Sequence, residues 1–335
     1  MKFKVHSLII GVLFFIGCHS PGNALKSTIH RWPVMGTFYE VTWVSHEPNH
    51  EELSKLMFEK IKYVDEKVST YKSQSDLSKL NASSGRAGVL VDPITKELLE
   101  KSFQYRRQTK GWFDIAVGAL VKIWKLNEPV HGQQRNIPSD RSIQKTVDVV
   151  RKTKIKWTDQ RAILSPQGAY LDMGAIAKGY AMDLAHSVVS NAACGFMNLG
   201  RQIMLIGSCS SPLQFGVQNP NDETQVLATI ELSEGSISTS GSYERYFIHN
   251  NRRYAHIINP KTGYPVESDV LSVTVWAQSA IDADVWSTTL FIAGFEEGIK
   301  IIEREKKEIG VLWVFKDQKI LYRDSAFGRA IKNNL

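Results

Sequence analysis

Cysteine is scarce in this sequence, and charge of one sign gathers nowhere along it. Only three cysteines occur among 335 residues, so a dense disulfide framework is excluded. The 41 basic and 34 acidic side chains give a formal net charge of +7, and the basic excess is spread along the chain. A basic excess without blocks predicts an ordinary solvated surface, so we expect no nucleic-acid partner.

Disordered and collagen-like chains are excluded as well. Hydrophobic residues make up 43% of the sequence and aromatic residues 10%, which is ample for a packed core. At roughly 150 residues per domain, the length predicts two domains or one large domain with two lobes.

Long apolar runs are absent after the N-terminus. Lys2 and Lys4 precede an apolar run at residues 8–17, which is too short for a comfortable membrane span and typical of a signal peptide. We expect residues 1–17 to be that signal peptide. The next residue, Cys18, resembles the lipidated cysteine of a bacterial lipobox, with ordinary signal cleavage as the alternative. The sequence therefore predicts an exported chain.

The organisation of the exported chain follows from its composition. Residues 18–30 are rich in Ser, Gly, Asn and Pro and are expected to form a tether, while residues 31–335 form the functional domain. Cys194 and Cys209 are the only cysteines of that domain. Export permits a disulfide between them, but isolated cysteines are often just small buried residues, so both alternatives stay open.

Helical and strand patterns are mixed without a regular repeat. Helices are expected at residues 51–68, 93–108, 118–125, 139–151, 177–190, 279–293 and 295–303. Strands are expected at residues 37–45, 161–164, 310–314 and 319–323, with further short strands between 197 and 275. This mixture favours an α+β architecture over a doubly wound sheet or a solenoid.

The segment Leu171–Asp183 runs from a strand-like stretch through small residues into a helix. Small residues before a helix expose backbone amides to an anion, and Lys178 adds a positive charge, so the segment is a candidate phosphate cradle. It matches neither a Walker loop nor a dinucleotide fingerprint. A purely structural glycine-rich helix start is the competing interpretation.

Asp284 and Thr288 lie four residues apart in a predicted helix, so their oxygens project from one face. One carboxylate and one hydroxyl suit Mg²⁺, which keeps waters and shares its shell with substrate phosphates. The alternative is an acidic first turn that favours the helix dipole, and we prefer that interpretation for Asp282.

Two further segments carry polar groups but no decisive pattern. His256 alternates with apolar neighbours before a tight turn, and a lone histidine in a strand is usually packed or hydrogen-bonded. Residues 236–243 are rich in hydroxyls but lack the Gly-x-Ser-x-Gly context of a hydrolase, so they predict a binding loop or a polar strand end.

Taken together, seven short motifs follow one another over nearly the whole mature chain. They are Met35–Thr37; Ser69–Tyr71 with Ser75, Ser78 and Asn81; Phe113–Asp114 with Val117, Gly118 and Trp124; Asp172–Ala181 with Asp183; Ser238–Gly241; His256–Pro260 with Thr262 and Gly263; and Ala283–Asp284 with Ser287 and Thr288. The set resembles the ApbE family of FAD:protein FMN transferases, flavin-handling lipoproteins of the bacterial envelope. Seven motifs in the right order are hard to obtain by chance.

The resemblance implies a fold and a reaction. The fold is a two-lobed, T-fold-like α+β domain with mixed, largely antiparallel sheets and packed helices, and the flavin nucleotide lies between the lobes. Such proteins cleave the pyrophosphate of FAD, join FMN through a phosphoester to a threonine hydroxyl of a target protein, and release AMP. The usual targets are flavin-carrying subunits of membrane-bound electron-transfer complexes. The implied location is the periplasmic side of the inner membrane, with a lipid anchor at Cys18.

The resemblance also implies roles at the phosphates. Mg²⁺ would be held by Asp284, Thr288 and the main-chain carbonyl of Ala175, making phosphorus more electrophilic and AMP a better leaving group. Lys178 and the amides around Gly174 would cradle the phosphates.

Further cofactor-binding roles follow from the same resemblance. Met35 and Tyr71 would line the flavin site, since the Tyr71 ring suits stacking. Phe113 belongs to the same cofactor-binding set, and Asp114 and Asp172 would meet nucleotide hydroxyls or ring nitrogens. His256 would contact the nucleotide and act as general base for the acceptor threonine, because imidazole titrates near neutral pH.

One departure from the family pattern concerns the segment Asn198–Ile203. The chain reads Asn-Leu-Gly-Arg-Gln-Ile where the family often has Asn-Leu-Gly-Gly-Asp-Ile, which changes backbone freedom and charge. Arg201 could bind phosphate, or mark a member that holds FAD without transfer or has another acceptor. The alternatives to a transferase are therefore a Mg²⁺-dependent FAD pyrophosphatase and a non-catalytic FAD-binding lipoprotein.

Overall fold

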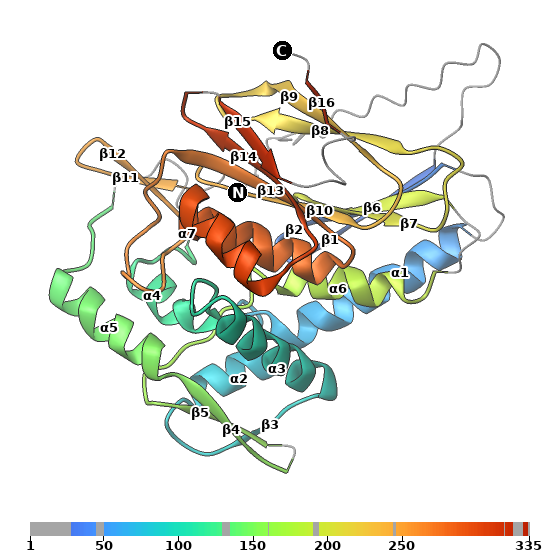
Figure 1. Ribbon diagram of the computed structural model, residues 1–335. Coiled ribbons are helices and arrows are strands. Elements are labelled where there is room, and N and C mark those ends of the chain that lie inside the picture. Colours follow the sequence, from blue (N-terminus) through green and yellow to red (C-terminus); the bar gives the residue numbers. More distant parts are fainter. Residues whose placement is uncertain are drawn as a thin grey trace, which may run out of the picture.

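An eight-stranded antiparallel sheet organises the chain (Figure 1). The computed structural model describes residues 28–44, 50–128, 135–159, 161–189, 194–243, 246–317, 319–323 and 331–333. In spatial order the strands of the sheet are β1 (Thr28–Val34), β2 (Thr37–Trp43), β6 (Gly195–Leu199), β7 (Gln202–Ile206), β10 (Ser236–Gly241), β13 (Val270–Ala277), β14 (Gly310–Phe315) and β15 (Ile320–Arg323).

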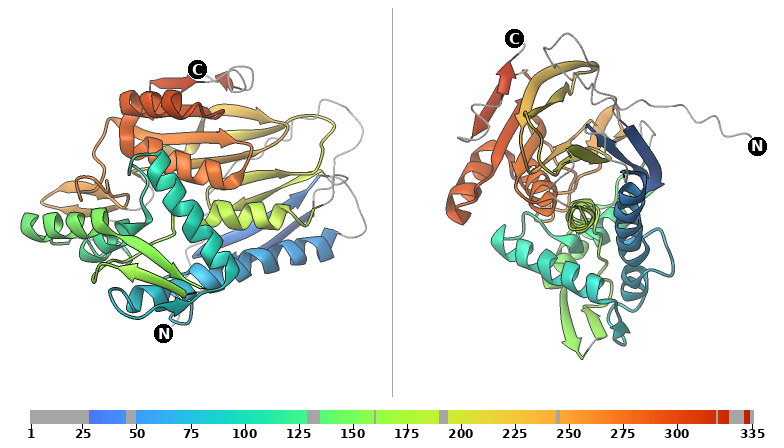
Figure 2. Two further views of the ribbon diagram at one scale, coloured as in Figure 1. Left: turned by 60° about the horizontal axis from the view of Figure 1, so that its bottom comes forward. Right: turned by 90° about the vertical axis from the view of Figure 1, so that its right-hand side faces the viewer.

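The two faces of this sheet are covered differently. Helices α1 (His50–Val68), α6 (Ala177–His186) and α7 (Ala280–Glu305) lie on one face, with α6 between the other two (Figure 2, right). The other face carries a three-stranded sheet of β8 (Leu213–Asn219), β9 (Asp222–Leu232) and β16 (Ile331–Asn333).

The side chains of strand β14 pack against both the helices and the three-stranded sheet. Val311 and Trp313 pack with the α7 side chains, whereas Leu312 and Val314 join the cluster under β8 and β9. Because successive side chains of a strand point to opposite faces, an uninterrupted apolar strand is what a doubly covered sheet requires.

A second lobe adjoins the helical face of the sheet. It contains α2 (Asp76–Ala82), α3 (Pro93–Gln108), the short 3₁₀ helix η1 (Ile115–Val117), α4 (Gly118–Ile123), α5 (Asp140–Lys152), and a small sheet of β3 (Val89–Leu90), β5 (Arg161–Ser165) and β4 (Lys154–Thr158). A hairpin of β11 (Tyr246–His249) and β12 (Arg252–Ala255) lies beside it. One apolar cluster runs from Tyr39 and Val41 of the large sheet into α3 and α5, so the two lobes share a core.

The predicted α+β class with largely antiparallel sheets is confirmed. Most predicted helices are present within a residue or two, but α6 ends at His186 rather than at residue 190. The break predicted between residues 293 and 295 is also present, because the backbone of Gly294 (φ 75°, ψ −178°) leaves the helical conformation inside α7.

Other expectations need correction. The tether was expected to reach residue 30, yet Thr28 already begins β1. Among the described strands β1 lies at the edge of the large sheet, a position that tolerates Pro33. Helix α2 was not predicted because it is only seven residues long and has little periodicity. The predicted signal peptide and Cys18 lie outside the described residues. None of the described helices has the length and apolar character needed to cross a bilayer.

The structure settles the question of the cysteine pair. Cys194 and Cys209 form a disulfide that joins the chain just before β6 to the chain just after β7. The bond closes the open end of this hairpin, opposite its turn at Gly200–Arg201.

This connectivity predicts a measurable stabilisation. A disulfide that closes a loop of this size typically contributes about 2–4 kcal/mol to the free energy of unfolding. Cys194→Ala/Cys209→Ala should lower that free energy by about this amount in urea titrations, and reduction of the wild-type chain should produce the same shift. Equal stability of the oxidised, reduced and double-alanine proteins would contradict the assignment.

Candidate active site

The loop before α6 is fixed by the second lobe. Asn81 brackets Leu171, since its amide donates to the Leu171 carbonyl at 2.9 Å and its carbonyl accepts the Leu171 N–H at 2.7 Å. The next N–H, of Asp172, donates to the Ile115 carbonyl at 2.8 Å. In the sequence, Asn81 belongs to one of the family motifs but carries no predicted role. In the structure it holds the start of the predicted cradle in place.

Asp172 closes the turn of this loop. Its carboxylate accepts the Gly174 N–H at 2.7 Å. Removal from water raises the pKa of the Asp172 carboxyl, and the Gly174 N–H and the Lys178 charge only partly oppose that shift. Among the amides around Gly174, which are predicted to cradle phosphate, the N–H of Gly174 itself donates to Asp172 in this structure.

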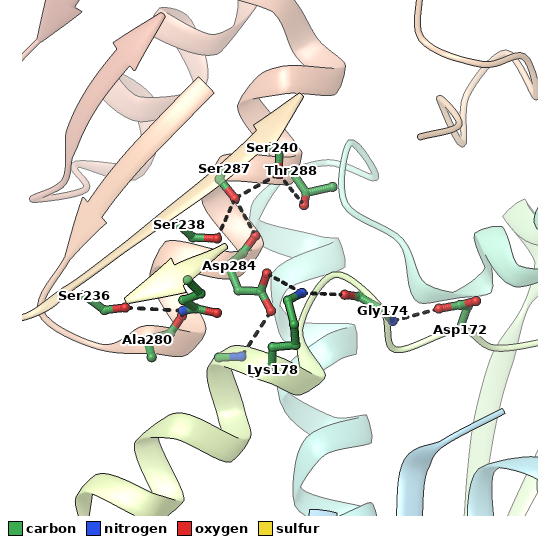
Figure 3. Close-up of polar contacts among 12 residues, drawn as sticks. Asp172, Gly174, Lys178, Ser236, Ser238, Ser240, Ala280, Asp284, Ser287 and Thr288 are labelled. Carbon is green, nitrogen blue, oxygen red and sulfur yellow. Dashed lines mark hydrogen bonds and ion pairs between the residues drawn. The ribbon is translucent and has the colours of Figure 1, made fainter. Parts of the chain in front are cut away.

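Asp284 joins α7 to the first turn of α6 (Figure 3). Its carboxylate lies 3.3 Å from Lys178 Nζ and accepts the Gly179 N–H at 3.1 Å, with only 3% of the residue exposed. Lys178 Nζ also donates to the Gly174 carbonyl at 3.1 Å. The two helices approach so closely that a Cβ on Gly179 would lie 2.4 Å from the Ala280 carbonyl oxygen, so only glycine fits there. These residues form the Asp284 cradle: Asp172, Gly174, Lys178, Gly179 and Asp284.

A row of hydroxyls extends the cradle along β10. Thr288, one turn after Asp284, shares a hydrogen bond of 3.2 Å with Ser240, which is also 3.0 Å from Ser287 (Figure 3). Ser287 donates in turn to Ser238 at 3.4 Å. The hydroxyl-rich segment is therefore a strand whose inward serines face α7. The alternation of Ser236, Ser238 and Ser240 was the signal for this role in the sequence.

The start of α7 is anchored from two sides. Both carboxylate oxygens of Asp183 accept N–H groups, from Ala280 at 2.7 Å and from Ile281 at 2.9 Å. Burial raises the pKa of Asp183 to about 6 although these two hydrogen bonds favour the charged form. Gln202 donates to the Ala280 carbonyl at 2.6 Å from the opposite side.

Asp282 is turned away from the cradle, as its helix-start interpretation predicted. It lies 3.1 Å from the Tyr105 hydroxyl, 3.1 Å from the Trp286 indole nitrogen and 3.1 Å from Lys307 Nζ. Asp282 therefore contributes to the helix start and its packing, and Asp284 is the acidic residue of α7 that belongs to the cradle.

The cradle has the chemistry of a hard-cation site. It offers the buried Asp284 carboxylate and the carbonyls of the Gly174 turn, where Ala175 is the next residue, and the Thr288 hydroxyl lies one helical turn beyond Asp284. In this structure the Lys178 ammonium supplies the positive charge. Within the described part of the chain, no group of three or more His, Cys, Asp or Glu side chains could hold a metal. The donors present fit Mg²⁺, which accepts few protein ligands and retains waters.

Met35 lies in a turn that precedes the contact between Thr37 and the Gly200 turn. It occupies the β1–β2 turn with a left-handed backbone (φ 51°). The side chain of Thr37, which follows that turn, packs against Gly200, and a Cβ on Gly200 would also lie 3.9 Å from Lys178 Cδ. The structure thus brings the Met35 turn, the Gly200 turn and Lys178 together.

Tyr71 presents its ring to solvent, with 73% of the residue exposed. The backbone just before Tyr71 is held in place by α2. The hydroxyls of Ser75 and Ser78 both donate to the Ser69 carbonyl, at 2.7 Å and 3.3 Å. Ser75 also caps α2. An exposed ring on a fixed support is suited to stacking.

Asp114 and Phe113 face α3 rather than the cradle. The Asp114 carboxylate lies 2.9 Å from Arg106 Nε and accepts the Ala116 N–H at 2.9 Å. Burial raises the pKa of Asp114 to about 6, with Arg106 opposing the shift. Asp114 lines a surface hollow of about 630 Å³ together with Arg106, while Phe113 is only 3% exposed and packs edge-on against Tyr105.

His256 follows β12 in a bend and is partly exposed. The loop beyond it is held by a hydrogen bond of 2.8 Å from the Trp124 indole to the Gly263 carbonyl and by a bridge between Ile258 and Pro265. The structure links Asp172, Lys178 and Asp284 in the cradle and brings the Met35 turn to the Gly200 turn, while Tyr71, Phe113, Asp114 and His256 lie in other segments of the chain.

The double acceptor role of Asp183 generates a stability prediction. Asp183→Ala leaves two N–H groups of α7 without their carboxylate, and loss of such a cap typically costs about 0.5–2 kcal/mol. Urea titrations should show a loss in this range. Asp148→Ala, at an exposed position of α5, is the control and should change stability by less than about 0.5 kcal/mol. Equal effects of the two substitutions would contradict the anchoring role.

Comparison with known proteins places this geometry in a family. The model of the ApbE family matches residues 35–313. Proteins named FAD:protein FMN transferase are similar to the chain: that of Escherichia coli K12 is 28% identical over 325 residues, covering 91% of each chain, and that of Haemophilus influenzae is 29% identical over 318 residues, covering 90% of each.

Solved structures agree with the sequence comparison. The crystal structure of the ApbE protein from Thermotoga maritima superposes with a TM-score of 0.82 at 28% identity, covering 92% of this chain and 100% of that one. The flavin transferase ApbE from Vibrio cholerae gives a TM-score of 0.77 at 25% identity, covering 91% and 100%. The matched region contains every element that builds the Asp284 cradle, and the chain belongs to the ApbE family.

Proposed function

We propose that this chain is a Mg²⁺-dependent FAD:protein FMN transferase. The observation that carries the proposal is the buried Asp284 carboxylate, paired with Lys178 and one turn from the Thr288 hydroxyl, in a chain of the ApbE family. The names of its relatives support the reaction.

In the proposed reaction, the oxygen of an acceptor threonine bonds to the phosphorus of the FMN half of FAD. The bond from that phosphorus to the bridging oxygen breaks, and AMP leaves with this oxygen. The proton of the hydroxyl passes to His256, the proposed general base. The products are a phosphoester-linked FMN and free AMP, so no oxidant or reductant is required.

The residues at the cradle would have different roles in this reaction. Asp284, Thr288 and the Ala175 carbonyl would hold Mg²⁺, which supplies charge neutralisation at the pyrophosphate. Lys178 is mobile enough to turn from Asp284 to a phosphate oxygen, since its ammonium group ends a flexible four-carbon stem. Asp172 keeps the Gly174 turn closed while the phosphates bind.

The remaining predicted residues would position the dinucleotide. Tyr71 would stack on a flavin ring, with Met35 lining the same site near the Gly200 turn. Asp114 and Asp172 would contact nucleotide hydroxyls or ring nitrogens, and Phe113 would support Asp114 from the core.

We also propose where the enzyme works. Lipid on Cys18 would anchor it to the periplasmic side of the inner membrane. The acceptor would be a flavin-carrying subunit of a membrane electron-transfer complex. A short tether before Thr28 would keep the enzyme near such a partner.

Mass spectrometry of an acceptor tests the proposed reaction. The mature chain is mixed with FAD, Mg²⁺ and a candidate acceptor domain that carries the target threonine. The intact acceptor should gain the mass of FMN less one water, and EDTA should prevent the gain. Free FMN and AMP without a labelled acceptor would favour a pyrophosphatase, and bound, uncut FAD with several acceptors would favour a binding protein.

A pair of variants on α7 tests the metal assignment. Asp284→Asn removes the charge of the cradle and should abolish turnover while the melting temperature stays within a few degrees of the wild-type value. Asp282→Asn, two residues earlier on another side of α7 and facing Tyr105, should retain turnover. Normal turnover in Asp284→Asn would contradict the metal assignment.

A further inference from the structure

The hollow that Asp114 lines, of about 630 Å³, opens between the C-terminal ends of α3 and α5 and the loop that follows His256. Cationic side chains gather in its lining, from segments that lie far apart in the sequence. Besides Arg106, they are Arg107, Lys110, Arg151 and Lys261. The fold therefore assembles this basic hollow from cations that are spread along the chain.

Among the described residues that line the basic hollow, Asp114 is the one carboxylate, and it is paired. It lies 2.9 Å from Arg106 Nε, and both side chains are largely buried. No carboxylate of the described chain lies within ion-pair distance of the other four cations. The lining therefore carries four positive charges without a partner charge.

The walls of the basic hollow are tied to one another by hydrogen bonds. The Arg106 guanidinium, on α3, donates to the Thr153 carbonyl just after α5, at 2.7 Å. Arg151, in the last turn of α5, donates to the Lys261 carbonyl of the loop at 3.3 Å. The Lys261 ammonium in turn lies 3.8 Å from the centroid of the Trp112 ring. The fold itself thus holds the cations around the hollow.

Helix dipoles explain only part of this cluster. Cations in the last turn of a helix are favourable, which accounts for Arg107 and Arg151. Lys110 and Lys261 lie outside the helices, so the dipoles give no reason for their presence.

The position of Lys261 is unfavourable for its charge. Burial lowers the pKa of the Lys261 ammonium. Glu297 opposes this shift, whereas the charges of Arg304 and Lys110 add to it. A bound anion would offset both effects, because it would replace lost hydration and weaken the repulsion between the cations.

The shape of the basic hollow indicates the kind of partner. A planar membrane surface meets protruding side chains, whereas these cations line a concavity. The volume of about 630 Å³ exceeds that of a phosphate group, and the lining includes the apolar side chains of Phe103, Val150 and Pro260. A protruding protein segment with carboxylates and a small apolar contact complements both the charge and the shape.

We propose that the basic hollow is a docking site for an acidic segment of the acceptor protein, an inference that rests on the proposed function. Carboxylates of this segment accept hydrogen bonds from the guanidinium groups of Arg107 and Arg151 and pair with the two lysines. The loop that lines the hollow begins after His256, the proposed general base. Docking beside this loop raises the effective concentration of the acceptor threonine.

Initial rates of flavinylation test the docking site. Labelling of the acceptor domain is measured by mass spectrometry over a range of acceptor concentrations, with FAD and Mg²⁺ in excess. Arg107→Gln/Lys110→Gln removes two exposed charges of the hollow and should raise the KM for the acceptor about fivefold or more. The kcat and the KM for FAD should stay within about twofold of the wild-type values, because only acceptor binding is weakened.

Arg141→Gln/Lys145→Gln is the matched control. It removes one arginine and one lysine at exposed positions of α5 that do not line the hollow, so both variants have the same net charge. All of these constants should stay within about twofold of the wild-type values in the control. With added salt, kcat/KM for the acceptor should fall less steeply in the hollow variant than in the control.

A competitor identifies the chemistry of the occupant. A short polyglutamate peptide should compete with the acceptor for the wild type and far less for the hollow variant. Inorganic phosphate at the same ionic strength should not compete, because a single phosphate cannot reach all four cations. Competition by phosphate as strong as that by polyglutamate would make the hollow a small-anion site and overturn the proposal.

Other results would overturn it as well. An equal KM for the acceptor in the hollow variant and the control would exclude docking there. A raised KM for FAD alone would make the hollow part of the nucleotide site, and weaker binding to phosphatidylglycerol vesicles alone would make it a membrane contact. A wild-type chain that labels no acceptor would overturn the proposed function itself, whereas normal labelling by both variants overturns only the docking site.

Discussion

The carboxylate of Asp284 joins the two helices, α6 and α7, that carry the candidate site. A buried charge is unfavourable unless it is paired and hydrogen-bonded, and Asp284 satisfies this condition only through α6, with the Gly179 N–H and the Lys178 ammonium. The cradle therefore exists only when α6 and α7 meet at their first turns. The absence of a side chain at Gly179 permits that approach.

Three sets of hydrogen bonds from the rest of the fold stabilise the contact between α6 and α7. Asp183 and Gln202 fix the first turn of α7, Asn81 and Ile115 fix the loop before α6, and the serines of β10 bind the second turn of α7. The large sheet supplies β10 and the β6–β7 turn, while the second lobe supplies Asn81 and Ile115. The site thus depends on both lobes, which is consistent with the core that they share.

Sequence patterns predicted the local features of this arrangement well. The four-residue spacing of Asp284 and Thr288 and the small residues before Lys178 follow from helix geometry and from backbone access, so they can be identified without a structure. The contact between Lys178 and Asp284 could not be predicted, because 106 residues separate the two in sequence and only the packing of α6 on α7 joins them.

The same reasoning explains the expectations that needed revision. The ion pair between Asp114 and Arg106 of α3 was not predicted, because only the packing of the η1 segment on α3 brings the two side chains together. Residues 28–30 of β1 were assigned to the tether because residues 18–30 are rich in Ser, Gly, Asn and Pro, whereas the pairing of β1 with β2 is a tertiary property. The pairing of Cys194 with Cys209 depended in turn on the register of β6 and β7, which spacing alone does not fix.

If Asp284 holds Mg²⁺ as proposed, the cation must compete with the Lys178 ammonium for the same carboxylate. The most direct measurement is the affinity of the wild type and of Lys178→Met for Mn²⁺ in the absence of nucleotide. Electron paramagnetic resonance measures the free and the bound Mn²⁺. The account predicts severalfold tighter Mn²⁺ binding in Lys178→Met, because the competing ammonium group is gone, and loss of binding when Asp284→Asn is added. Equal or weaker binding in Lys178→Met would contradict it.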